Sequence, residues 1–111
     1  FLIKLFKLYY LNVPRLRESR LYFCLLFVGL GGNIGHYYEI VKICEEKGLK
    51  LILDAAHMAG TRYEGIIPGR EADAVIYSFQ AVKNLPTSDS GMLCFKEKCL
   101  DETVRKYAWL G

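Results

Sequence analysis

The sequence predicts an α/β fold with a mainly parallel sheet and flanking helices. Two apolar strands, Leu21–Val28 and Leu51–Asp54, enclose a segment, Tyr37–Lys47, whose apolar residues recur with helical spacing. Each strand is a continuous apolar run, which is typical of parallel strands that are buried on both faces. A strand, a helix and a second strand with short connections form a βαβ unit, and we therefore expect the two strands to be parallel.

The helix is predicted from apolar positions at i, i+3, i+4 and i+7, which place one apolar face toward a core. These positions are Tyr37, Ile40, Val41 and Cys44. Glycine is frequent directly after a helix, so Gly48 marks the expected end. The glycine-rich segment Gly29–Gly35 supplies the turn between the first strand and the helix.

Further elements follow toward the C-terminus. Ala74–Phe79 and Gly91–Phe95 are apolar and bounded by turn residues, and we expect them to be a third and a fourth strand. Between the second and third strands, Thr61–Pro68 resembles a small hairpin with glycine at its turn. The final segment, Lys96–Trp109, is predicted to be a helix.

We divide the chain at residue 21. Residues 1–20 are rich in Leu, Tyr and Lys and end in the charge cluster Arg15–Arg20, and we treat them as an N-terminal extension of uncertain structure. Residues 21–111 carry every pattern described above and form the predicted domain.

The bulk composition favours a soluble globular protein. Of the 111 residues, 52% are hydrophobic and 24% are charged, which is enough apolar surface to form a core. The net charge of +3 arises from 15 basic and 12 acidic residues, and this mild balance argues against nucleic-acid binding. The longest apolar run, Leu21–Leu30, is short of the roughly 20 residues that span a membrane.

Cysteine usage indicates a reducing compartment. The four cysteines form no CxxC pair, and they are best explained as small hydrophobic residues of a cytoplasmic protein. The two histidines have no cysteine pair at zinc-ligand spacing, and so we expect no metal site.

One hypothesis for the glycine turn is dinucleotide binding. A strand leads into Gly29, Gly32 and Gly35, and a second strand ends in Asp54 roughly 20 residues later, as in a Rossmann-type NAD(P) domain. Ile34, however, interrupts the G-x-G-x-x-G form. Glycine-rich turns are also common between strands and helices, so this signal alone is weak.

A second hypothesis starts from three residues at the carboxyl ends of strands. Asp54 ends one buried strand, Ser78 ends the next, and Lys83 follows five residues later. Pyridoxal phosphate needs this set: an amine for its aldehyde, donors for its phosphate and an anion for its ring nitrogen. Singly, each residue has an ordinary explanation as a turn cap, an incidental hydroxyl or a solvated amine. Their joint placement at one sheet edge favours the cofactor site.

Four segments resemble the DegT/StrS-like family of fold-type-I aminotransferases, which act on keto-sugars attached to nucleotides. They are LILDAAHMAG (51–60), ADAVIYSFQAVKNLPTSDSGMLCF (72–95), more loosely FVGLGGNIGHYYEI (27–40), and the closing RKYAWLG (105–111). The resemblance implies that residues 21–111 are part of the large, pyridoxal-phosphate-binding domain of such an enzyme.

The resemblance also implies roles for five residues. Asp54 would pair with the protonated ring nitrogen, Ala56 would pack on the ring face, and His57 would hydrogen-bond the 3-hydroxyl. Ser78 would bind the phosphate, and Lys83 would form the Schiff base. Some members carry histidine in place of this lysine and act as dehydratases, and Lys83 argues against that branch.

For the whole protein, the resemblance implies transfer of an amino group from an amino acid, usually glutamate, to a keto-sugar nucleotide. It also implies a homodimer. The family's upstream phosphate-binding turn, its ring-stacking aromatic residue and its C-terminal domain are not assigned in this chain, which we expect to be inactive alone. A non-catalytic remnant or a regulatory binding protein of the same fold is the remaining alternative. The family often has histidine where this chain has Gly29.

Overall fold

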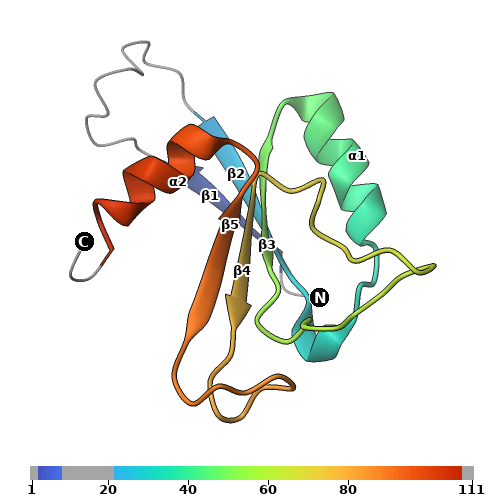
Figure 1. Cartoon of the computed structure of the whole chain (residues 1–111). Coiled ribbons are helices and arrows are strands. Elements are labelled where there is room, and N and C mark those ends of the chain that lie inside the picture. Colours follow the sequence, from blue (N-terminus) through green and yellow to red (C-terminus); the bar gives the residue numbers. More distant parts are fainter. Residues whose placement is uncertain (1–2, 9–21, 109–111) are drawn as a thin grey trace.

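The structure is a computed structural model that describes residues 3–8 and 22–108. Within these residues, five strands form one sheet in the order β1-β2-β3-β4-β5 (Figure 1). The strands are β1 (Ile3–Leu8), β2 (Tyr22–Val28), β3 (Lys50–Asp54), β4 (Ala74–Ser78) and β5 (Gly91–Phe95).

The centre of the sheet is parallel, as predicted. Strands β2, β3 and β4 run in the same direction, whereas β1 and β5 pair antiparallel at the two edges. The α/β class is therefore confirmed, and the antiparallel edges were not foreseen. Strand β1 lies within the segment taken as an N-terminal extension, whose residues 1–2 and 9–20 are outside the described part.

Helix α1 (Tyr37–Lys47) has the predicted bounds. It ends where Gly48 adopts the left-handed conformation (φ +63°), which glycine accepts without steric cost. A short 3₁₀ turn, η1 (Leu30–Gly32), lies between β2 and this helix. Neither α1 nor any other helix in the described residues is long and apolar enough to cross a membrane.

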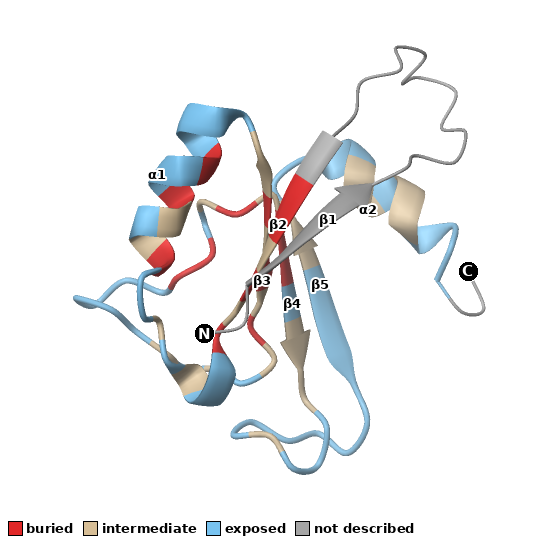
Figure 2. Cartoon of the chain, turned by 180° about the vertical axis from the view of Figure 1, so that it is seen from behind, coloured by how far each residue is buried: buried red, intermediate tan, exposed pale blue. Residues whose placement is uncertain are grey.

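The core lies between α1 and one face of the central strands (Figure 2). Residues that are neighbours across parallel strands point to the same face, so Phe27, Leu53 and Val75 form one row. Tyr37 of α1 is fully buried against this row, and its ring contacts Phe27 edge-on at 5.4 Å between centroids. The periodicity of the helix and the apolar runs of the strands are thus satisfied by one shared core.

Helix α2 (Lys98–Arg105) is shorter than the predicted Lys96–Trp109. The backbone amide of Lys96 donates to the carbonyl of Asp73 (3.0 Å), and Glu97 is still extended (φ −103°, ψ 123°). Lys96 is thus still bound to the residue that precedes β4, and the helix begins two residues later than predicted. Arg105 is followed by a turn, and residue 109 lies outside the described part.

The predicted hairpin is present in minimal form. Tyr63 and Ile66 exchange two backbone hydrogen bonds of 2.9 Å. The two residues between them, Glu64 (φ 50°) and Gly65 (φ 82°), both have positive φ, as a type I′ turn requires.

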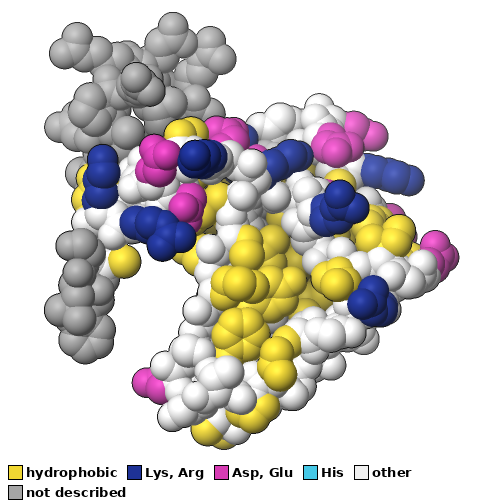
Figure 3. Space-filling model, viewed as in Figure 1, with side chains coloured by type: hydrophobic (Ala, Val, Ile, Leu, Met, Phe, Trp, Pro, Cys, Tyr) yellow, Lys and Arg dark blue, Asp and Glu magenta, His cyan; other side chains and the backbone are white. Residues whose placement is uncertain are grey.

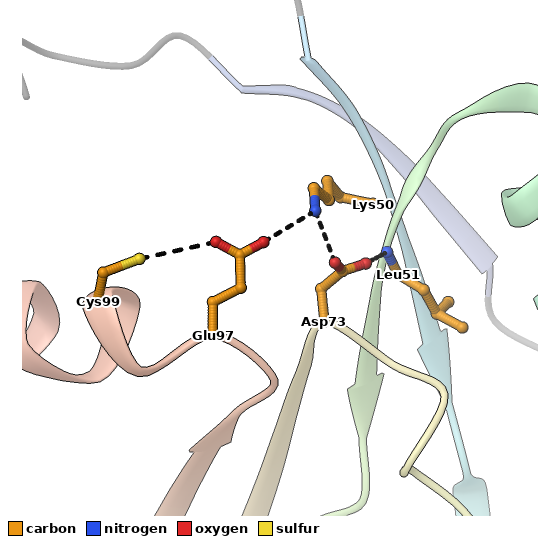
Figure 4. Close-up of polar contacts among 5 residues, drawn as sticks. All are labelled: Lys50, Leu51, Asp73, Glu97 and Cys99. Carbon is orange, nitrogen blue, oxygen red and sulfur yellow. Dashed lines mark hydrogen bonds and ion pairs between the residues drawn. The ribbon is translucent and has the colours of Figure 1, made fainter. Parts of the chain in front are cut away.

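A polar cluster joins the elements at the end of the sheet remote from the carboxyl ends of β2, β3 and β4 (Figure 4). The Lys50 amine lies 2.7 Å from Asp73 Oδ1 and 3.6 Å from Glu97 Oε1. Asp73 Oδ2 accepts the backbone N–H of Leu51 (2.9 Å). The hydrogen bond from Lys50 to Asp73 raises the pKa of the lysine. The cluster therefore connects β3 with the residues that precede β4 and α2.

Candidate active site

Three segments meet at the carboxyl ends of the parallel strands. They are Gly29–Gly35 after β2, Asp54–His57 at the end of β3, and Ser78–Lys83 at the end of β4. Gly29 N–H donates to the Asp54 carbonyl (3.0 Å), and Ala55 N–H donates to the Ile76 carbonyl of β4 (2.8 Å), two residues before Ser78. This edge is where ligands bind in open α/β sheets.

Asp54 and Ser78 project from the same face of the sheet. Asp54 is the register partner of Ile76, and Ser78 lies two residues further along β4. Because side chains alternate along a strand, both point away from the face that α1 covers. Each is partly buried, which leaves both side chains accessible to a ligand from that side.

The carboxylate of Asp54 has an unused acceptor oxygen. Its Oδ1 accepts the backbone N–H of Ala56 (3.0 Å), so part of its role is to stabilise the turn after β3. Within the described residues, no hydrogen bond or ion pair to Oδ2 is present. An ionised carboxylate accepts at both oxygens, and Oδ2 is thus suited to an N–H donor such as a protonated pyridine ring.

His57 is exposed and oriented by the glycine turn. The backbone N–H of Gly31 donates to His57 Nδ1 at 3.2 Å. Nδ1 is therefore the ring atom that accepts this hydrogen bond.

Lys83 lies on the loop between β4 and β5. Its backbone N–H donates to the Gln80 carbonyl (2.9 Å). The next residue, Asn84, donates a side-chain hydrogen bond to the carbonyl of Ala59, on the segment that follows Asp54. The loop that carries the predicted Schiff-base lysine is therefore attached to the segment that carries the predicted ring-nitrogen partner.

The Lys83 side chain itself is partly buried. Its amine makes no hydrogen bond or ion pair with another described residue. It stays a prediction that one cofactor contacts all five predicted site residues, which are Asp54, Ala56, His57, Ser78 and Lys83.

A cavity of about 660 Å³ lies on the face of the sheet that α1 covers, opposite to the face of Asp54 and Ser78. Val75, Tyr77 and Cys94 line it from β4 and β5, and residues 62 and 65–70 form its opposite wall. Figure 3 shows hydrophobic side chains gathered over these two strands. None of the five predicted site residues lines this cavity. The described residues also contain no group of three or more His, Cys, Asp and Glu that is arranged to hold a metal ion.

Sequence reasoning missed the residues that support the site. Gly31 contacts His57, Thr61 donates to the Gly32 carbonyl (3.3 Å), and Asn84 contacts Ala59. Each pair is separated by more than 20 residues, so no local pattern reveals the contact. Only Asn84 had a signal, because it directly follows Lys83 in the segment 72–95 that resembles the family.

Comparison with known proteins decides the family. The profile described as the DegT/DnrJ/EryC1/StrS aminotransferase family matches residues 23–111. The chain belongs to this family. The dTDP-4-dehydro-2,3,6-trideoxy-D-glucose 4-aminotransferase of Saccharopolyspora spinosa is 34% identical over 87 residues, which are 78% of this chain and 23% of that protein. The spore coat polysaccharide biosynthesis protein SpsC of Bacillus subtilis is 35% identical over 78 residues, 70% of this chain and 20% of SpsC.

Solved structures of aminotransferases share the fold. TlmJ from Streptoalloteichus hindustanus matches with a TM-score of 0.71 and 37% identity, over 79% of this chain and 24% of TlmJ. PseC of Helicobacter pylori, an aminotransferase of pseudoaminic acid biosynthesis, matches with a TM-score of 0.67 and 25% identity, over 72% of this chain and 22% of PseC. The described chain thus corresponds to part of a fold-type-I aminotransferase and spans less than a quarter of the length of these relatives.

Proposed function

We propose that the protein containing this chain is a pyridoxal-phosphate-dependent aminotransferase that acts on a nucleotide-linked keto-sugar. Family membership supports the aminotransferase activity. The relative from Saccharopolyspora spinosa, named as a 4-aminotransferase of a dTDP-linked dehydro-sugar, supports the substrate class. Spr1654 of Streptococcus pneumoniae, which was solved in a PLP form, matches with a TM-score of 0.61 and 27% identity and supports the cofactor.

One observation in this chain carries the proposal. The hydrogen bond from Asn84 to Ala59 brings the loop of Lys83 to the segment of Asp54, at the sheet edge where Ser78 also ends its strand. An amine, a carboxylate and a hydroxyl thus lie on adjoining segments. This donor and acceptor set fits the aldehyde, the ring nitrogen and the phosphate of pyridoxal phosphate.

The proposed roles follow from the chemistry of each side chain. Lys83 would hold the cofactor through its aldehyde, Ser78 would donate to its phosphate, and Ala56 would pack on its ring. When bound, the cofactor supplies an electron sink for the α-carbon of the amino donor. Asp54 would keep a proton on the ring nitrogen, because its charge favours the protonated ring. The Lys83 amine, once released, is suited to accept and return the proton of the α-carbon.

Further proposals concern the surroundings of the reaction. Glutamate is the proposed amino donor, a homodimer the proposed assembly, and the cytoplasm the proposed location. The four free cysteines are consistent with that reducing compartment. Since the chain spans only 23% of its relative from Saccharopolyspora spinosa, we propose that turnover needs the parts that the other 77% supply.

The geometry of the glycine turn argues against the NAD(P) alternative. A Rossmann turn offers free backbone N–H groups to a pyrophosphate at the start of a helix. Here Gly31 N–H donates to His57, Gly32 N–H to the Gly29 carbonyl (3.1 Å), and Gly35 N–H to Asn33 Oδ1 (2.8 Å). Three amides that would bind the pyrophosphate are thus engaged within the protein.

Cofactor titration of the full-length protein separates these alternatives. We expect saturable binding of pyridoxal phosphate with the near-visible absorbance of a lysine-bound cofactor, and no saturable binding of NAD or NADP. Glutamate should then discharge this absorbance, and a keto-sugar nucleotide should restore it. Tight dinucleotide binding would support the Rossmann alternative, and folded protein that binds neither cofactor would support the non-catalytic remnant.

A further inference from the structure

We infer that the glycine turn Gly29–Gly35 positions His57, and that the Gly31 amide fixes the imidazole as a hydrogen-bond donor through Nε2. The inference rests on the proposed function and deepens it, because it specifies which ring nitrogen of His57 faces the cofactor. It also gives the glycine-rich segment a role that neither the core nor a dinucleotide requires.

The turn is bound along its length to the segment that follows β3. At its start, Gly29 N–H donates to the Asp54 carbonyl (3.0 Å). In its middle, Gly31 N–H donates to His57 Nδ1 (3.2 Å), and the Gly32 carbonyl accepts the hydroxyl of Thr61 (3.3 Å). Three successive contacts leave the turn little freedom to slide past the imidazole.

Two of the contacts depend on glycine. Gly31, whose N–H donates to His57, has φ +64°, a left-handed conformation that strains other residues. Gly32 has φ +78°, and a Cβ there would lie 3.2 Å from both the His57 carbonyl oxygen and Thr61 Oγ1. Glycine therefore permits both the left-handed backbone of the turn and the close approach of the two segments.

The consequence for His57 follows from the valence of imidazole. A neutral ring has one N–H and one acceptor nitrogen, and a backbone N–H can only donate. While Gly31 donates to Nδ1, the hydrogen of His57 must reside on Nε2. His57 then presents a donor to a ligand, and this donor matches an oxygen acceptor such as the ionised ring oxygen of pyridoxal phosphate. Gly31 is thus a positioning residue that acts through His57.

The tautomer is measurable without cofactor or activity. We would label the full-length protein with ¹⁵N-histidine and record imidazole ¹⁵N–¹H correlations at about pH 9, where neutral rings predominate. The signal absent from His57→Phe identifies His57. We expect a single Nε2–H form, whereas an unconstrained histidine exchanges between both tautomers. An Nδ1–H form, or an exchanging mixture, would overturn the inference.

Amide exchange of Gly31 provides the second measurement. His57→Phe removes the acceptor, and we expect Gly31 N–H to exchange about tenfold faster, as the loss of one ordinary hydrogen bond implies. His57→Asn is the matched control, because its Oδ1 replaces Nδ1 as an acceptor at the δ position and should retain protection. Equal exchange in wild type and His57→Phe would contradict the contact.

The two proposals fail separately. A fixed Nε2–H form in a protein that binds no pyridoxal phosphate would support the positioning of His57 and refute the proposed function. Cofactor binding with a mobile tautomer would do the reverse.

Discussion

Replacement of Gly29 by alanine tests the packing behind the candidate site. A Cβ at this position would lie 2.0 Å from Met58 Sδ and 2.6 Å from Met58 Cγ, well inside contact distance. Met58 is only 3% exposed, so its side chain must repack within the core rather than turn into solvent. Overpacking of this kind costs about 1–3 kcal/mol, and we expect Gly29→Ala to lower the free energy of unfolding by that amount.

The cause would be steric rather than conformational. Gly29 has φ −81°, which any L-residue adopts, so backbone strain contributes little. Met58→Ala alone should cost about 2–5 kcal/mol, because it empties a buried volume. In the double variant the new methyl group enters that volume, and the total cost should fall below the sum of the single costs by about 1 kcal/mol or more.

Urea unfolding of the four proteins measures this coupling. Met58→Leu is the control, because it preserves the volume at position 58 and should retain the penalty of Gly29→Ala. Unchanged stability of Gly29→Ala, or single costs that simply add, would show that Met58 does not fill the space in front of Gly29.

Three further outcomes are expected. Lys83→Ala should abolish both transamination and the absorbance of lysine-bound cofactor, and ordinary turnover by this variant would refute the assignment. Asp54→Asn should keep the absorbance but slow turnover up to about a thousandfold, if an ion pair worth roughly 4 kcal/mol acts wholly in the transition state; His57→Ala should have the smaller effect, and the reverse order would reassign the ring-nitrogen partner. Alkaline unfolding should depend on Lys50, because the hydrogen bond to Asp73 raises the pKa of this lysine in the folded state. The ion pair therefore stabilises the fold below about pH 10.4, the ordinary pKa of lysine, and this stabilisation is lost as the pH rises through the folded-state pKa. Lys50→Met should make the stability curve flatter above that pH, and an identical curve would show that the ion pair is not coupled to folding.

Some helices and strands could be predicted from the spacing of apolar residues within their own segments. The apolar periodicity of Tyr37–Lys47 and the left-handed Gly48 define α1 to the residue. The buried runs of β2, β3 and β4 likewise appear as strands and in the predicted parallel arrangement. The start of α2 was misplaced because Lys96 bonds to Asp73, a residue 23 positions earlier, and no local pattern reports that contact.

The candidate site divides in the same way. The sheet edge was predictable, because Asp54 and Ser78 end strands that any βαβ arrangement aligns. The contacts that position the loops were not, since Gly31 with His57 and Asn84 with Ala59 depend on how the turns pack. Met58 shows the same limit: its packing against Gly29 requires two segments that the sequence separates by a whole helix.

The central claim is that Lys83 carries the cofactor, and chemical trapping tests it directly. The full-length protein would be loaded with pyridoxal phosphate, reduced with borohydride to make the lysine bond permanent, digested, and mapped by mass spectrometry. We predict one phosphopyridoxyl group, on the peptide that contains Lys83. The same group on a different lysine, or no modified peptide from folded protein that has been saturated with cofactor, would contradict the account.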